Sequence, residues 1–134
     1  MADRAFKPGP QALEPKTVLL TAQVAIGAIG APTLSAANSK GFKSVTRNSA
    51  GNYTFTLGTP SGATDKYQKI AFVGVEFVRI DAATAPAAPL VSVVARTPSS
   101  GTFQILCEDA DTPAATDPAS GETMLLTVLA VNGS

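Results

Sequence analysis

The positions of the prolines constrain this chain more than any other feature of its sequence. Proline lacks a backbone N–H and clashes with the preceding turn of a helix, so it ends helices and is excluded from the middle of sheets. The Ala-rich windows in the second half of the chain are the stretches best suited to helix formation. They are interrupted by Pro86, Pro89, Pro113 and Pro118. We therefore expect no helix longer than about two turns.

Between the prolines, apolar and polar residues alternate with a period of two, which is typical of strands that bury one face. Residues 41–57 predict a hairpin that turns through about four residues around Gly51. Its first strand is expected to carry Phe42, Ser44 and Thr46 on one face. Its second strand is expected to point three large side chains one way, namely Tyr53, Phe55 and Leu57.

The same pattern predicts strands elsewhere in the chain. These segments are residues 16–30, 69–80, 90–97, 102–109 and 122–131, and Gly27 and Gly30 interrupt the first of them. Residues 69–80 are apolar on both faces, which favours a central strand. About seven to eight short strands without helices between them predict an all-β, antiparallel fold, either a β-sandwich or a jelly-roll-like barrel.

The start of the chain differs from the rest, because Pro8, Pro10 and Pro15 block regular strand pairing there. We expect residues 1–15 to form an extended arm and residues 16–134 to form a single β domain. Ordering the arm costs about 1–2 kcal/mol of backbone entropy per residue, so contacts with a neighbouring subunit or a larger surface are expected to hold it. Packing against its own sheet is the alternative. The residues expected to make these contacts are Phe6, Pro8, Pro10 and Leu13.

The charge balance argues against two classes of partner. The chain carries ten Lys/Arg and ten Asp/Glu, so neither a nucleic-acid-binding face nor an anchor on an anionic membrane is expected. Residues 1–69 hold eight basic and three acidic residues, whereas residues 70–134 hold two basic and seven acidic ones. Strands from the two halves can interleave and mix these charges, or the halves can form complementary patches that join like subunits.

The sequence favours synthesis and residence in the cytoplasm. No window approaches the roughly 20 apolar residues of a membrane span. The N-terminal residues lack the apolar centre of a secretory signal. The single cysteine, Cys107, excludes an internal disulfide, and its place in an apolar run predicts that it is buried.

Residues that carry chemistry are sparse. Histidine is absent, which removes the commonest general base and metal ligand, so we expect no enzyme activity, cofactor or metal. Glu108, Asp109, Asp111 and Asp117 form one acidic cluster, and no Trp accompanies it as a sugar-stacking platform. A solvated loop is the expected role of these carboxylates. Calcium binding is the alternative, although their spacing does not continue as in an EF-hand loop.

The segment GFKSVTRNSAGNYTFTL, residues 41–57, resembles a pattern found in small structural proteins of tailed phages. The resemblance implies a virion protein, and most specifically a non-enzymatic decoration (cement) protein on the capsid surface, assembled in the host cytoplasm. The partners that it implies are the major capsid protein and copies of the chain itself, as a dimer or trimer. A tail, baseplate or fibre component is the alternative. A carbohydrate-binding module is less favoured, because Trp is missing.

Deleting residues 2–14 is expected to leave the β domain folded while weakening attachment to the particle, because the arm supplies contacts but no core. The melting temperature is expected to stay unchanged. The affinity for the particle is expected to fall about tenfold or more, which corresponds to a loss of about 1.4 kcal/mol of binding free energy. Sedimentation of the particle with full-length and truncated chains measures this loss. Equal binding by the two chains would show that the arm takes no part in attachment.

Overall fold

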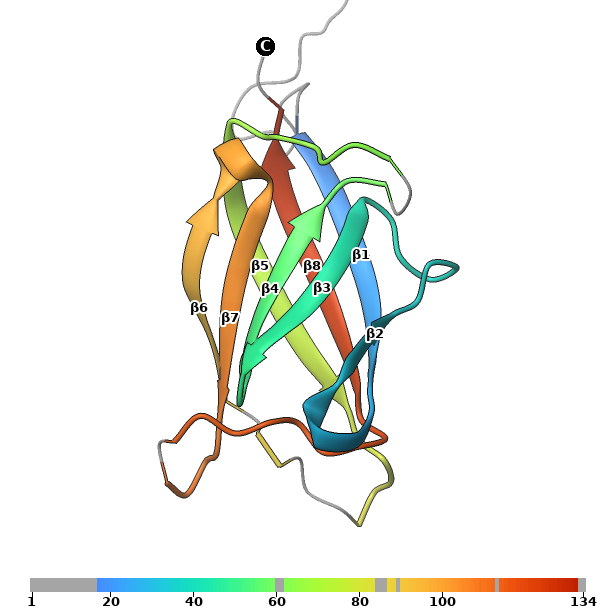
Figure 1. Ribbon diagram of the computed structural model, residues 1–134, viewed down its shortest axis with the longest axis vertical. Helices are drawn as coiled ribbons and strands as arrows, with labels where there is room; N and C mark the ends of the chain where they lie inside the picture. The colour runs from blue at the N-terminus through green and yellow to red at the C-terminus, as the bar shows by residue number, and fades with distance from the viewer. Residues whose placement is uncertain (1–16, 60–61, 84–86, 89, 113, 133–134) are drawn as a thin grey trace, which may run out of the picture.

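Figure 1 shows the computed structural model of the chain, in which two β-sheets pack face to face. The structure describes residues 17–59, 62–83, 87–88, 90–112 and 114–132. The predicted arm lies outside the described residues, and so do its expected contact residues Phe6, Pro8, Pro10 and Leu13. The described part is all-β and antiparallel, which confirms the predicted sandwich.

Eight strands and two short 3₁₀ segments make up the described part of the chain. The strands are β1 (Thr17–Ile26), β2 (Pro32–Leu34), β3 (Phe42–Ser49), β4 (Asn52–Leu57), β5 (Lys69–Val78), β6 (Leu90–Thr97), β7 (Thr102–Glu108) and β8 (Thr123–Val131). The 3₁₀ segments are η1 (Ala28–Gly30) and η2 (Pro98–Ser100). η1 lies where Gly27 and Gly30 were predicted to interrupt the strand of residues 16–30.

Each sheet has four strands and combines segments from both halves of the sequence. The first sheet has the order β2-β1-β8-β5, and the second has the order β3-β4-β7-β6. In each sheet the two strands from the basic first half, among β1–β4, lie next to each other, and so do the two from the acidic second half, among β5–β8. The two halves of the chain share both sheets but do not interleave within them. β1 and β8, the first and last strands, lie side by side in the middle of the first sheet (Figure 1).

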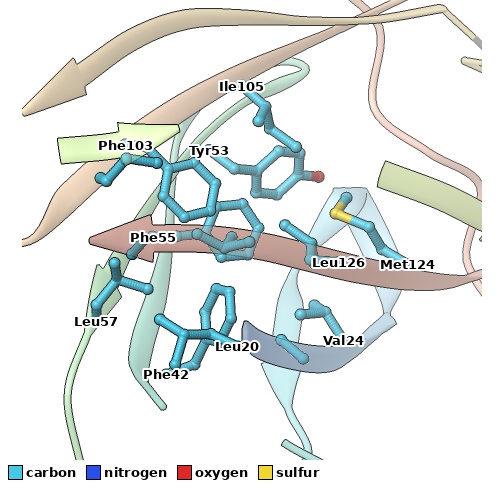
Figure 2. Packing of buried hydrophobic residues seen from close by; sticks show 14 of the residues in the cluster. Leu20, Val24, Phe42, Tyr53, Phe55, Leu57, Phe103, Ile105, Met124 and Leu126 are labelled. Carbon is cyan, nitrogen blue, oxygen red and sulfur yellow. The ribbon is translucent and has the colours of Figure 1, made fainter. Parts of the chain in front are cut away.

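The space between the sheets is filled by the inward-facing residue of every second position. Its centre is an aromatic cluster from the second sheet, formed by Phe42, Phe55 and Phe103, which are at most 1% exposed. The rings of Phe55 and Phe103 stack with centroids 5.1 Å apart, and Phe42 meets both edge-on at 6.1 Å. Figure 2 shows this cluster together with the side chains of the first sheet that belong to the same core, among them Leu20, Val24, Met124 and Leu126.

The predicted hairpin is confirmed as β3 and β4, with a tighter turn than expected. Only Ala50 and Gly51 lie between the two strands. Gly51 has a φ of +71°, and a Cβ added there would lie 2.5 Å from the carbonyl oxygen of Cys107. The turn therefore requires glycine at this position. The three side chains predicted to point one way are fully buried, namely Tyr53, Phe55 and Leu57.

One prediction for β3 is wrong, because the strand contains a bulge near its start. The register shifts after Phe42, which lies opposite Leu57, whereas Ser44 lies opposite Thr56. Phe42 faces the core, but Ser44 and Thr46 are exposed to solvent. The extra residue reverses the side on which the following side chains lie. The three predicted residues therefore do not share a face.

The predicted central position of residues 69–80 is also wrong. β5 is an edge strand of the first sheet and is hydrogen-bonded to β8. Its outward-facing Phe72 is 55% exposed, so apolarity on both faces here does not reflect burial on both faces. β2 was not predicted as a strand, because its three residues begin at Pro32 within a mainly polar segment. It pairs with the end of β1.

Phe55→Ala is expected to lower the free energy of unfolding by about 3–5 kcal/mol, because it removes a fully buried ring from the aromatic cluster. Thr56→Ala, at the neighbouring outward-facing position, is expected to change it by no more than about 0.5 kcal/mol. Urea titrations of the two variants and the parent chain measure both values. A loss below about 1 kcal/mol for Phe55→Ala would contradict a central role for the ring stack.

Candidate protein-binding surface

Asp117 does not lie in a solvated loop, as the sequence had suggested for the acidic cluster. Its side chain is 19% exposed and forms an ion pair with Arg47. Both carboxylate oxygens take part, because Oδ1 accepts from Arg47 Nε at 2.9 Å and Oδ2 accepts from Nη2 at 2.7 Å. This two-point geometry is the strongest that an arginine and a carboxylate can make. The expectation of a solvated side chain is therefore corrected for Asp117.

The same carboxylate connects three separate parts of the chain. Gly51 donates its backbone N–H to Asp117 Oδ1 at 2.8 Å, and this bond ties the β3–β4 turn to the loop before β8. The Tyr53 hydroxyl lies 3.5 Å from Asp117 Oδ1 and donates to the backbone oxygen of Gly30 in η1 at 2.7 Å. These five residues, Gly30, Arg47, Gly51, Tyr53 and Asp117, are called the Asp117 cluster below.

The electrostatics of the Asp117 cluster favour one fixed protonation state. Hydrogen bonds from Arg47 and from the Gly51 amide hold the pKa of the Asp117 carboxyl below its ordinary value. Burial, reinforced by the charge of Asp117, raises the pKa of Tyr53 above its ordinary value. The carboxylate is thus ionised and the phenol neutral near pH 7, so neither group is poised to exchange a proton. The arrangement is that of a structural tie.

Of the other acidic residues of the predicted cluster, Asp111 is exposed, and Glu108 and Asp109 are half-buried. Asp109 Oδ1 accepts the backbone N–H of Asp111 at 2.8 Å, which is a local turn within the exposed loop. In the part of the chain that the structure describes, no group of three or more His, Cys, Asp or Glu side chains is placed to hold a metal ion. Because Asp117 is engaged by Arg47, it is not available as the third ligand of the calcium alternative.

Cys107 lies in β7 and points into the core, as predicted from its apolar surroundings. It is fully buried and has no disulfide partner. Burial raises the pKa of its thiol to about 12. Thiols react as thiolates, so this cysteine is an inert core residue near neutral pH.

The outer faces of the two sheets differ in polarity. Outward positions of the second sheet include the polar residues Ser44, Thr46, Asn52, Thr54, Thr56, Ser92, Thr102 and Gln104, with Leu90 and Leu106 as large apolar side chains near one end. Five large apolar side chains lie on the outer face of the first sheet: Leu19, Phe72, Val78, Leu125 and Leu129. We call these five residues the apolar face. An antiparallel sheet ordinarily turns polar residues to water, so the first sheet departs from the usual pattern.

Three members of the apolar face lie next to one another across three strands. Leu129 of β8 lies directly between Leu19 of β1 and Phe72 of β5. Leu19 is 61% exposed, and Phe72 is 55% exposed. Two rows further along, beyond Thr21, Thr127 and Gly74, Leu125 lies between Gln23 and Glu76. Phe72 and Leu125 nevertheless line one depression, and exposed apolar side chains gathered on one face are a mark of an interaction site.

A depression lies within the apolar face at Gly74, where the sheet has no outward side chain. It has a volume of about 340 Å³ and is lined by Phe72, Gly74, Val75, Glu76, Leu125 and Thr127. The Phe72 ring extends toward Gly74, since a Cβ added to that glycine would approach the ring at 2.9 Å. The glycine thus lets the ring lie along the sheet. A depression beside an exposed aromatic ring offers a partner side chain a place to insert.

Sequence reasoning missed the apolar face, although a signal for it was present. The residues of 69–80 and 122–131 are apolar at inward and outward positions alike. Such a strand is either buried on both sides or exposed as a binding surface, and the pattern alone does not separate the two. In the described part of the chain no further layer covers the outer face of the first sheet, which decides in favour of exposure.

Comparison with protein-family models, curated proteins and solved structures finds no match for this chain. Within the described ranges, no helix has the length and apolarity needed to cross a membrane. The function is therefore inferred from the apolar face together with the resemblance of residues 41–57.

Asp117→Asn is expected to destabilise the fold by about 1–3 kcal/mol at pH 7, because it removes the charge from the Arg47 pair. The folded-state pKa of Asp117 lies below its unfolded value. The charged carboxylate therefore stabilises the fold above the unfolded pKa of about 3.9, and this contribution is lost as pH falls through the folded pKa. Urea unfolding between pH 7 and pH 2 should show this loss in the parent chain but not in the variant.

Asp111→Asn serves as the matched control, because Asp111 lies in the exposed loop. It is expected to change stability by no more than about 0.5 kcal/mol at pH 7. If Asp117→Asn behaves like this control at every pH, the ion pair is not a structural tie.

Proposed function

We propose that this chain is a non-enzymatic virion structural protein that binds and stabilises a phage capsid shell as a decoration protein. The observation that carries the proposal is the apolar face on the first sheet. A rigid sheet that presents Leu19, Phe72 and Leu129 to solvent is suited to lie against another protein surface. The resemblance of residues 41–57 to structural proteins of tailed phages supplies the class of partner.

The scarcity of charged side chains on the apolar face supports a protein partner. Interface cores are depleted in charge and enriched in aromatic residues. Glu76 is the one charged residue among the outward positions of the three paired rows that run from Leu19 to Glu76. Threonines at positions 21 and 127 flank the depression and supply polar groups for hydrogen bonds. Nucleic acid would instead require a basic surface.

The proposed partners are the major capsid protein, through the apolar face, and copies of the chain itself. The arm of residues 1–15 is proposed to add contacts along a neighbour or the shell, with Phe6 and Leu13 as its apolar anchors. A chain that is already attached to the shell through one contact forms its second contact at high effective concentration, so two contacts together hold each copy more tightly. The proposed location is the capsid surface of the virion.

The proposal is tested on particles produced by the genome that encodes this chain. Mass spectrometry of purified particles should detect the chain, and cryo-electron microscopy should show it on the outer surface of the head. Density at the tail, baseplate or fibre would replace the capsid assignment with the alternative. Absence of the chain from purified particles would overturn the virion assignment.

The role of the apolar face is tested with Phe72→Glu, which places a charge beside the depression. We expect the variant to keep the parent's melting temperature, since Phe72 is exposed. Its affinity for phage heads from which the chain has been removed is expected to fall about tenfold or more, which corresponds to at least about 1.4 kcal/mol. Thr54→Glu on the polar outer face of the second sheet is the matched control and is expected to bind as the parent does. Equal binding by both variants would show that the shell contacts another surface.

A further inference from the structure

One carboxylate borders the depression in the apolar face. Among the residues that line the depression, Glu76 alone carries a charge. It is exposed on β5, at the outer face of the first sheet, and its neighbour across the ladder is Leu125. The cores of protein interfaces are depleted in charged residues. A carboxylate within an otherwise uncharged docking surface therefore calls for a specific counterpart on the partner.

Glu76 has no ionic counterpart among the described residues, with which its side chain forms neither an ion pair nor a hydrogen bond. Lys40 lies on the same outer face, but beside Thr21 on the far side of β1. Three strand spacings, or about 14 Å at roughly 4.8 Å each, separate the backbone of Lys40 from that of Gly74 in β5. This separation exceeds the Debye length of about 8 Å at physiological ionic strength. The carboxylate is therefore available to a partner.

The groups around the depression match the chemistry of an arginine side chain. The Glu76 carboxylate can accept two parallel N–H bonds, which a planar guanidinium supplies. The Phe72 ring attracts a cation that lies within about 6 Å of its centre. Leu125 offers apolar surface to the methylene stem of an arginine. The Thr127 hydroxyl can accept one further N–H.

The size and shape of the depression fit a single side chain. Its volume of about 340 Å³ is at the lower end of the roughly 300–1,000 Å³ of small-molecule pockets. Phe72 and Glu76 lie about 14 Å apart along β5, at roughly 3.4 Å per residue, with Gly74 midway between them. The Phe72 ring extends toward that glycine. A cation placed above Gly74 therefore lies between the ring and the carboxylate.

We propose that the depression binds an arginine side chain of the protein partner, with its guanidinium between the Phe72 ring and the Glu76 carboxylate. The inference rests on the proposed function, because it takes the apolar face as the docking surface. Docking removes Glu76 from water, and a carboxylate buried without a counter-charge is strongly unfavourable. An arginine on the partner offsets this penalty with a two-point, charge-assisted contact. Lysine suits the site less well, because its ammonium is compact and more strongly hydrated.

The arginine is assigned to the capsid protein rather than to a second copy of this chain. Arg47 and Arg96 are held by bonds within their own chain. Arg79 also has a partner there. The described arginines of the chain are therefore engaged, and Arg4 lies in the arm outside the described residues. A metal ion is not an alternative occupant, because one carboxylate and one hydroxyl are too few oxygen ligands for calcium.

The site is tested on the isolated full chain with N-acetyl-arginine amide as the probe. NMR titration is expected to give saturable shifts at the amides of Phe72, Gly74 and Thr127, with a dissociation constant of about 1–10 mM. N-acetyl-citrulline amide has the same shape without the charge and is expected to bind about tenfold or more weakly. Glu76→Gln is expected to bind both probes equally. Equal responses of the parent chain to the two probes, including no response to either, would overturn the proposal.

The same titration tests whether the chain's own arm occupies the depression. Deletion of residues 2–14 removes Arg4 and is expected to leave the affinity for N-acetyl-arginine amide unchanged. An affinity that rises about tenfold or more on deletion would show that the arm competes for the site. That result would overturn the assignment of the arginine to the partner.

Glu76→Leu separates this inference from the proposed function, because it removes the charge and extends the apolar face. If the partner inserts an arginine, the affinity of the variant for phage heads from which the chain has been removed falls about tenfold or more. Glu108→Leu, on the second sheet, is the matched control and is expected to bind as the parent does. Both variants are expected to keep the parent's melting temperature.

The outcomes on phage heads distinguish two failures. If Phe72→Glu weakens binding while Glu76→Leu binds as tightly as the parent or more tightly, the apolar face docks without an arginine. This inference is then overturned and the proposed function stands. Unchanged binding by both variants would instead overturn the apolar face as the docking surface, and this inference with it.

Discussion

The fold depends first on the contact between the two sheets at the aromatic cluster. Each sheet has one face that must leave water, and the rings of Phe42, Phe55 and Phe103 fill the space where the two faces meet. Two of these rings come from neighbouring strands of the second sheet, and the third comes from its edge, so the cluster fixes the order of three strands. Strand register follows, since a slip of one residue would turn a ring into solvent.

The Asp117 cluster holds separate segments of the chain together at the end of the sandwich, as the aromatic rings do in its middle. Three segments far apart in sequence meet there, and each has backbone groups that a sheet ladder does not satisfy. One carboxylate accepts from Arg47 and from the Gly51 amide, while Tyr53 donates to Gly30. The same tyrosine is part of the buried core, so the polar tie and the apolar core share a residue.

Local pattern was enough to predict the all-β fold, the β3–β4 hairpin and the inward side of β4, because alternation and turn residues act over a few positions. It failed where the outcome depends on distant partners. Arg47 and Asp117 lie 70 residues apart, so nothing near Asp117 in sequence marks it as ion-paired. The bulge after Phe42 is set by pairing with β4, and the edge position of β5 by the order of the whole sheet. The apolar face was missed because local sequence does not show whether another layer of the fold covers an apolar sheet face.

The pairing of β1 with β8 has a mechanical consequence. Thr17 lies opposite Val131, so the two ends of the described chain leave the sheet from the same end of one antiparallel pair. The hydrogen bonds between antiparallel strands are perpendicular to the strands. Force that pulls the two ends apart would therefore break the β1–β8 hydrogen bonds one after another, and a small force would be enough. A pull between the start of β1 and the far end of β8 would load all nine paired positions together. The sandwich therefore resists force along these strands better than force that separates its two ends.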